Sequence, residues 1–99
     1  MSAFNIVRFR VKPGREEEFI EAHRNAEIQL EGFRHGVLIE TGNHGYCFIG
    51  EWDKLDNILT AEDSMVEILD SFRDTLEDLG NGLGVTDPVS GETVLEIET

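Results

Sequence analysis

The spacing of apolar residues changes period along this chain, and the order of those changes restricts the fold more than any other feature. Residues 3–11 (AFNIVRFRV) alternate with period two, which is typical of a strand. Residues 15–31 repeat apolar side chains every three or four positions, and acidic residues fill the first turn. That pattern predicts an amphipathic helix whose dipole favours those acids. Lys12-Pro13-Gly14 separates the two segments with typical turn residues.

Two more strands are expected at residues 33–41 and 45–52, on either side of Gly42-Asn43-His44-Gly45. A short glycine-rich turn between two apolar runs is typical of a β-hairpin. If Asn43 and His44 form its tip, counting back along both strands places His35 opposite Trp52.

Residues 53–80 predict a short helix, a bend and a longer helix, since their apolar stripe is interrupted by TAEDS (residues 60–64). Asp63 or Ser64 would cap the second helix, with Glu67 completing a capping box. Gly80-Asn81-Gly82 would end that helix. Residues 83–92 would then form a loop, and TVLEIE (residues 93–98) would form the last strand.

The resulting order is β-α-β-β-α-β, which predicts a ferredoxin-like α+β fold with one antiparallel four-stranded sheet and both helices on one face. The length of 99 residues fits a single domain, 1–99. The first strand and the hairpin are apolar on both faces, whereas a solvent-facing sheet surface is normally polar. We therefore expect a homodimer in which two sheets pack face to face as a dimeric α+β barrel.

The net charge of −13 restricts the partners, because an acidic surface repels nucleic-acid phosphates and anionic lipids. No apolar run approaches the ~20 residues of a membrane-spanning helix. The first residues lack a signal-peptide pattern, and a single cysteine cannot form an internal disulfide. These features favour a cytoplasmic location without nucleic-acid or membrane partners.

A metal or nucleotide cofactor is not expected. His35 and His44 are separated by roughly 25–30 Å along one strand and cannot share a metal ion within one chain. The sequence has no zinc-type spacing of histidine and cysteine, no P-loop and no dinucleotide fingerprint.

Three segments make the sequence resemble the antibiotic biosynthesis monooxygenase (ABM) domains of the dimeric α+β barrel superfamily. They are the passage from strand through KPG to the acidic helix (residues 11–19), EGFRHG (residues 31–36) and GEWDKLDNI (residues 50–58). The resemblance spans nearly the whole chain. It implies a cavity between sheet and helices that holds a small molecule, and members include cofactor-free oxygenases of polycyclic phenols and quinones.

The family that the sequence resembles also includes haem-degrading enzymes. These enzymes carry an iron-binding histidine about ten residues after a tryptophan that ends the third strand. Trp52 matches that tryptophan, but Glu62 occupies the histidine's place. Because a carboxylate is a poor replacement for imidazole on haem iron, haem degradation is disfavoured.

Three residues are candidates for catalytic proton transfer: His35, Glu62 and His23. His35 could donate a proton from the cavity wall or simply stack on Trp52. Glu62 interrupts an apolar stripe, so it could be a buried base, a surface residue of the bend or a helix cap. His23 lies on the apolar side of the first helix, where a buried structural histidine is the alternative.

Four residues are candidates for substrate binding: Trp52, Phe48, Tyr46 and Arg8. Trp52 and Phe48 would contact an aromatic ring, or Trp52 would fill the core. Tyr46 could stabilise an enolate or end the sheet, and Arg8 could bind an anionic substrate or pair with acids across the dimer.

Two functions remain open from the sequence. The first is a cofactor-independent monooxygenase-like enzyme that removes a phenolic proton from an aromatic or quinol-type substrate, so that the resulting carbanion reacts directly with oxygen. The second is a non-catalytic dimeric module that binds a metabolite or only assembles with itself.

Overall fold

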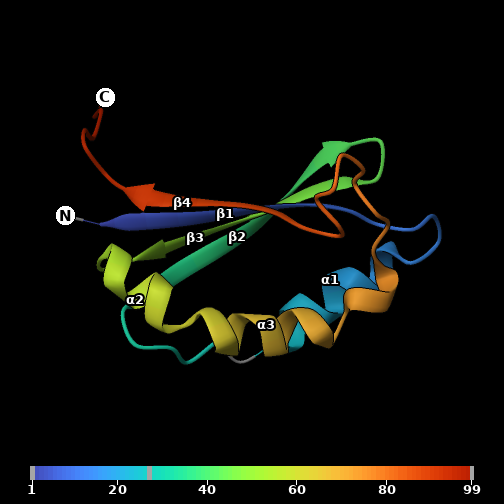
Figure 1. The fold of residues 1–99 in the computed structure, drawn as a ribbon, viewed down its shortest axis with the longest axis horizontal. Helices are drawn as coiled ribbons and strands as arrows, with labels where there is room; N and C mark the ends of the chain where they lie inside the picture. Colours follow the sequence, from blue (N-terminus) through green and yellow to red (C-terminus); the bar gives the residue numbers. More distant parts are fainter. Residues whose placement is uncertain (1, 27, 99) are drawn as a thin grey trace.

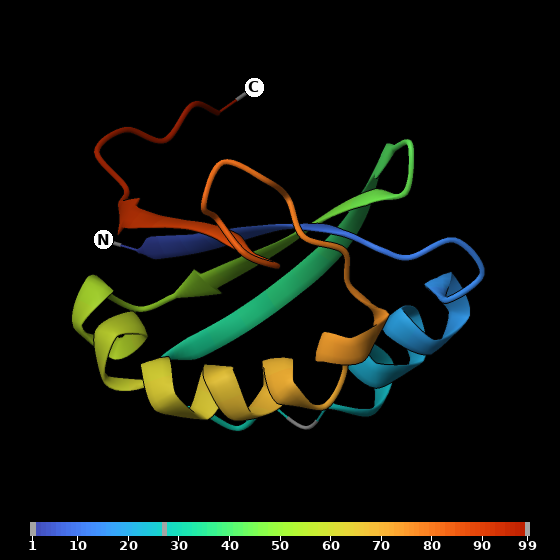
Figure 2. The ribbon, with the colours of Figure 1, turned by 45° about the vertical axis from the view of Figure 1, so that its right-hand side comes forward.

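The computed structural model describes residues 2–26 and 28–98, which form a two-layer α+β structure. Figures 1 and 2 show the helices gathered on one face of a twisted sheet. The strand order is β2-β3-β1-β4, and every neighbouring pair is antiparallel. The predicted ferredoxin-like fold class is confirmed. The elements are β1 (Ala3–Arg10), α1 (Glu16–Asn25), β2 (Phe33–Gly42), β3 (Gly45–Trp52), α2 (Leu55–Thr60), α3 (Glu62–Asp70), the 3₁₀ turn η1 (Arg73–Thr75) and β4 (Asp87–Glu92).

The hairpin between β2 and β3 has the predicted tip but a different register. Asn43 and His44 both have left-handed backbone, with φ of 56° and 64°, as a two-residue hairpin turn requires. Thr41 is an extra residue between the pairs Glu40–Tyr46 and Gly42–Gly45. This β-bulge shifts the pairing by one residue from Glu40 back to His35, and a second irregularity lies between His35 and Phe33.

Because of the bulge at Thr41, residues 35–40 lie on the opposite face of the sheet from the one predicted. His35 opposes Glu51, not Trp52, and Ile39 opposes Cys47. The predicted pairing of His35 with Trp52 is wrong, because a shift of one residue moves every side chain of a strand to the other face of the sheet.

The predicted helices are present but shorter. α1 ends at Asn25 rather than near residue 31, because Ala26 has extended backbone (φ −71°, ψ 119°). The predicted bend lies at Ala61, which alone separates α2 from α3. The predicted capping box is wrong: α3 begins at Glu62, before Ser64, and no side chain caps it. The Ala61 N–H donates to the Asn57 and Ile58 carbonyls, so α3 follows α2 with a single residue between them.

α3 also stops earlier than the predicted Gly80-Asn81-Gly82 segment. It ends at Asp70, and η1 follows after two residues. Thr75 is buried at the end of this turn, and its hydroxyl donates to the Phe72 carbonyl at 2.7 Å.

The last strand is six residues earlier than predicted. β4 occupies Asp87–Glu92, which was expected to be loop, whereas residues 93–98 have no regular secondary structure. Pro88 and Gly91 suggested turns, but an edge strand tolerates proline because only one side of it joins the ladder. Pairing with β1 therefore overrides local sequence preference here.

The core between sheet and helices is aromatic. Phe19 of α1 packs against Phe9 and Phe72, each with a centroid separation of 5.4 Å and edge-to-face geometry. A second cluster surrounds Trp52 and includes Ile58 and Ala61 at the α2–α3 junction. These two clusters fix the helices against the inner face of the sheet.

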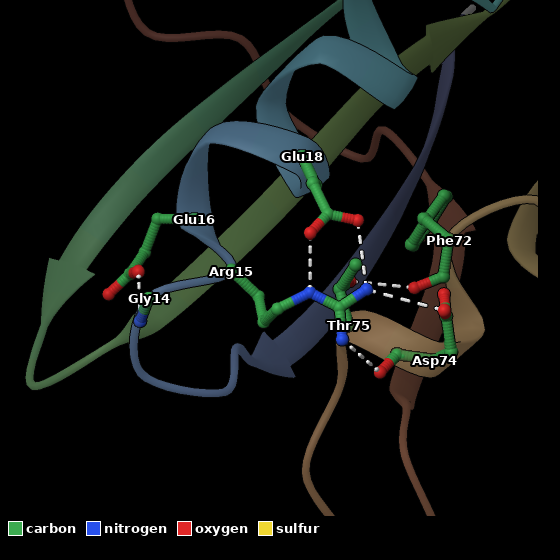
Figure 3. Close-up of polar contacts among 7 residues, drawn as sticks. All are labelled: Gly14, Arg15, Glu16, Glu18, Phe72, Asp74 and Thr75. Atoms are coloured by element: carbon green, nitrogen blue, oxygen red, sulfur yellow. Dashed lines mark hydrogen bonds and ion pairs between the residues drawn. The ribbon is translucent and has the colours of Figure 1, made fainter.

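Arg15 joins the start of α1 to η1 (Figure 3). Its guanidinium donates to both carboxylate oxygens of Glu18, at 2.6 and 2.8 Å, and to Asp74 at 3.3 Å. The hydrogen bonds from Arg15 hold the pKa of Glu18 below its ordinary value. The link ties two elements that lie far apart in sequence.

The outer face of the sheet, away from the helices, carries one continuous row of β-branched side chains. Cross-strand pairing puts them side by side across all four strands, and three of the four are exposed. We call this set the outer row: Val37, Ile49, Ile6 and Val89.

Candidate functional site

A cavity of about 380 Å³ lies between the inner face of the sheet and the helices α2 and α3. Most of its wall is apolar. The described residues that line it include Val7, Phe48, Ile58, Met65, Leu69 and Phe72, together with the polar side chains Asn5, His23, Trp52, Glu62, Thr86 and Ser90.

Small residues form a row across the inner face of the sheet, next to the side chains that line the cavity. Cross-strand pairing aligns Gly36, Gly50, Asn5 and Ser90 from β2 to β4. A side chain at either glycine would collide with its neighbours. A Cβ on Gly36 would lie 2.7 Å from the Phe48 ring, and one on Gly50 would lie 2.5 Å from the Asn5 amide oxygen. The glycines therefore provide the space in which the larger side chains of the site are placed.

Trp52 and Asn5 form a buried polar pair in the wall of the cavity. The Trp52 indole N–H donates to the Asn5 Oδ1 at 2.7 Å, and both residues are buried. Because an indole nitrogen can only donate, this bond fixes the orientation of the Asn5 amide. Among residues 2–26 and 28–98, the Asn5 NH₂ group donates only to the Met65 sulfur, at 3.8 Å, and a thioether is a weak acceptor. A ligand oxygen would be a stronger partner for this group.

His23 provides a hydrogen-bond acceptor in the same cavity. Its Nδ1 lies 2.9 Å from the Phe19 carbonyl oxygen. A carbonyl can only accept, so Nδ1 carries the proton, and Nε2 of the neutral ring is left as an acceptor. Burial among aromatic rings, with Phe72 at a centroid distance of 4.5 Å, lowers the pKa of His23. The ring is therefore neutral near pH 7.

Asn5 and His23 line the same cavity from β1 and α1. The centroid of the His23 ring lies 6.1 Å from that of Phe9 and 6.1 Å from that of Phe48. A hydrogen-bond donor and an acceptor thus lie in the wall of a largely apolar space.

Glu62 lies at the rim of the cavity, where it begins α3 and is exposed. This is the position at which the haem degraders of the resembled family carry their iron ligand. An exposed carboxylate there does not fit haem iron, so we assign no haem chemistry to this chain.

Three of the seven candidate residues lie outside the cavity. His35 is on the outer face, with its side chain 68% exposed and Nδ1 3.4 Å from Glu51. Arg8 is also on the outer face and pairs with Asp87 at 3.0 Å. Tyr46 is buried in the aromatic core, and its burial raises its pKa.

The other four candidates, His23, Phe48, Trp52 and Glu62, do line the cavity. Asn5 was not among the predicted site residues. Its signal in the sequence is a polar residue on the otherwise apolar face of β1 that carries Val7 and Phe9.

Among residues 2–26 and 28–98, no group of three or more histidine, cysteine or acidic side chains is arranged to hold a metal ion. In the same residues, no helix has the length and apolar character that crossing a bilayer demands.

Comparison with solved structures identifies the fold. A proposed antibiotic biosynthesis monooxygenase from Bordetella bronchiseptica matches 95% of this chain and 98% of its own, with 17% identity and a TM-score of 0.75. A variant of SnoaB, a cofactor-independent oxygenase from Streptomyces nogalater, matches 99% and 98%, with 14% identity and a TM-score of 0.75. A conserved protein from Methanosarcina mazei matches 93% and 92%, with 14% identity and a TM-score of 0.73.

By sequence, the chain matches no family model and no curated protein. The structural likenesses cover nearly the full length of both chains at identities below 20%. The chain therefore shares the α+β fold of these structures, which is the fold that its sequence resemblance implied.

Proposed function

We propose that the cavity binds a flat, largely apolar molecule with a phenol- or quinol-type group, and that the protein acts as a cofactor-independent monooxygenase. The observation that carries this proposal is that a neutral histidine acceptor and a fixed amide donor both lie in the wall of one apolar cavity. The name of SnoaB, a cofactor-independent oxygenase with the same fold, adds support.

His23 is the proton acceptor in this proposal. A phenolic hydroxyl would donate to its Nε2, while the Asn5 amide would donate to a carbonyl or oxyanion at the far end of the ligand. Phe48 and Trp52 would contact the ring between them. The lowered pKa of His23 keeps the ring unprotonated and available as a base near pH 7.

The reaction balances without a cofactor when the substrate supplies the electrons. Proton removal leaves an electron-rich carbon that adds oxygen to form a peroxide. Loss of water then converts a CH₂ group to a carbonyl, so that one oxygen atom enters the product and the other leaves as water. His23 would return its proton to the departing oxygen.

Binding and turnover of an anthrone- or quinol-like compound test this proposal. Trp52 is the only tryptophan, so its fluorescence reports binding, and oxygen uptake reports turnover. We expect His23→Phe to keep binding within a few-fold and to lower the rate about 100-fold or more, the usual contribution of a general base. His35→Phe is the matched control on the outer face and should change neither. Equal rates in both variants would contradict the role of His23, and binding without oxygen uptake in the parent would favour the non-catalytic module.

The second part of the proposal is a homodimer formed through the outer faces of two sheets. The exposed outer row supports it, because four adjacent β-branched side chains favour burial over contact with water. Sedimentation equilibrium tests it. We expect a dimer of the 11.2 kDa chain and a monomer for Ile6→Asp. A monomeric parent at micromolar concentration would contradict the dimer and leave the ligand proposal untouched.

A further inference from the structure

Met65 of α3 places a sulfur atom in the wall of the cavity. Its side chain is half-buried, and it lines the same space as Asn5 and Phe48. The helix that carries it also supplies Glu62 and Val66 to the lining, and both are exposed. The cavity therefore meets solvent along this helix. The proposed reaction gives the thioether no role.

The sulfur faces an amide whose donor group lacks a strong acceptor. Asn5 is 6% exposed, and its NH₂ group donates to Met65 Sδ at 3.8 Å. The bond from the Trp52 indole to Asn5 Oδ1 keeps the amide in this orientation. A buried donor with only a weak acceptor is stabilised when a better acceptor comes within reach. An oxygen atom on the sulfur would be such an acceptor.

Oxidation of the thioether supplies this oxygen. A sulfur lone pair attacks the terminal oxygen of a hydroperoxide, so that an S–O bond forms and the O–O bond breaks. The thioether loses two electrons, and the peroxide is reduced to an alcohol or to water. The proton of the terminal oxygen passes to the oxygen that leaves. The product, methionine sulfoxide, is a polar side chain in an otherwise apolar place.

No thiol competes with Met65 inside the cavity. Cys47 is the only cysteine of the chain, and it lies on the outer face of the sheet, opposite Arg8 and Ile39. A peroxide that enters the cavity therefore meets the Met65 sulfur as the sulfur available for oxidation.

We propose that Met65 is an oxidation site, and that the oxygen of its sulfoxide accepts a hydrogen bond from the Asn5 NH₂ group. The oxidant is a hydroperoxide, either hydrogen peroxide or one formed from an organic ligand in the cavity. The sulfoxide occupies the donor that is proposed to bind the ligand, so the oxidised protein binds that ligand more weakly. This weaker binding rests on the proposed function, whereas the oxidation and the new hydrogen bond do not.

Hydrogen peroxide tests the site in a Cys47→Ser background. We expect peptide mass analysis of the folded protein to show one added oxygen at Met65. The Asn5 side-chain NH₂ protons, followed by nuclear magnetic resonance, should then exchange with water about tenfold more slowly, because they are bound to a stronger acceptor. Unmodified Met65 under conditions that oxidise it in the urea-unfolded chain would overturn the proposal. Oxidised Met65 with unchanged Asn5 exchange would also overturn it.

Two substitutions at Met65 separate the new hydrogen bond from a change in packing. Met65→Gln provides a side-chain oxygen and should slow Asn5 exchange without peroxide. Met65→Leu is similar in volume but provides no acceptor, so peroxide should alter neither its Asn5 exchange nor its ligand binding. A Met65→Gln variant that behaves like Met65→Leu would contradict the hydrogen bond.

Anthrone binding, measured by Trp52 fluorescence, links the modification to the site. We expect the dissociation constant to rise about tenfold in the oxidised parent and in Met65→Gln, and not in peroxide-treated Met65→Leu. Equal affinity before and after oxidation would show that the sulfoxide does not occupy the ligand's donor. Absence of anthrone binding in the untreated protein would contradict the proposed function and, with it, the effect on binding. The mass and exchange measurements would still decide the oxidation site.

Discussion

At the scale of single residues, the site depends on the bond between Trp52 and Asn5 and on the glycine that makes room for it. Gly50 lies opposite Asn5 in the sheet, and its missing side chain lets the amide oxygen reach the indole. Local sequence does not reveal this dependence, because Gly50 and Trp52 lie on β3, more than forty positions from Asn5.

Gly50→Ala should therefore disturb the polar pair. Its Cβ would lie 2.5 Å from Asn5 Oδ1, so the amide must move and the indole N–H loses its buried acceptor. We expect a loss of about 1–3 kcal/mol in unfolding free energy, measured by urea denaturation, and a shift in Trp52 emission. Gly91→Ala, which has open space around it, is the control and should change both very little.

His23 should make stability depend on pH. Its pKa in the folded protein is lowered by burial, so the unfolded chain binds the proton more tightly. The contribution of the neutral His23 ring to stability is therefore fully present above the unfolded pKa of about 6.5. It declines as the pH falls below that value.

Denaturation of the parent and of His23→Phe from pH 8 to 5 tests this linkage. The decline below about pH 6.5 should be smaller in the variant. His35→Gln, exposed on the outer face, should retain it. Glu18, whose pKa is lowered by Arg15, adds its own loss only below about pH 4.3, so the two windows are separable. An identical decline in His23→Phe and the parent would contradict the assignment.

At the scale of elements, the bulge at Thr41 decides which side of β2 faces the cavity. It places Leu38 and Gly36 on the inner face and His35 on the outer face. The hairpin tip was predictable, because Asn43 and His44 between glycines are typical turn residues. The bulge was not, because it carries no comparable signature in the sequence.

Deletion of Thr41 should be well tolerated. It makes the pairs Glu40–Tyr46 and Gly42–Gly45 consecutive, as in a regular hairpin, and keeps Leu38 opposite Phe48. Deletion of Val37 should be severely destabilising, because Leu38 and Gly36 then become neighbours in sequence and cannot both lie on the inner face. We expect a loss of about 2 kcal/mol or more for the second deletion in urea denaturation and a much smaller loss for the first. Equal losses would contradict the assignment of Thr41 as the bulged residue.

At the scale of the whole molecule, the charge of −13 opposes the proposed dimer, because two acidic copies repel each other. Salt screens this repulsion but leaves the apolar contact of the outer rows. We expect the dimer dissociation constant to fall as NaCl rises from about 20 to about 500 mM, which sedimentation at both salt concentrations measures. Weaker dimerisation at high salt would indicate an interface governed by ion pairs instead.

The sequence by itself determined the order of elements, a bend within residues 60–64, the hairpin tip and the resemblance to ABM domains. Each of these depends on local periodicity or on turn residues that have few alternatives. Four of its candidate residues, Trp52, Phe48, His23 and Glu62, line the cavity, because bulky residues of the third strand and polar residues on apolar helix faces stand out locally.

Only the tertiary structure decided the rest. The position of β4, the face of His35 and the pairing of Asn5 with Trp52 depend on which strand lies beside which, and on a register that one bulged residue reverses. These are contacts between distant parts of the chain, and their energies exceed the local preferences of the segments involved.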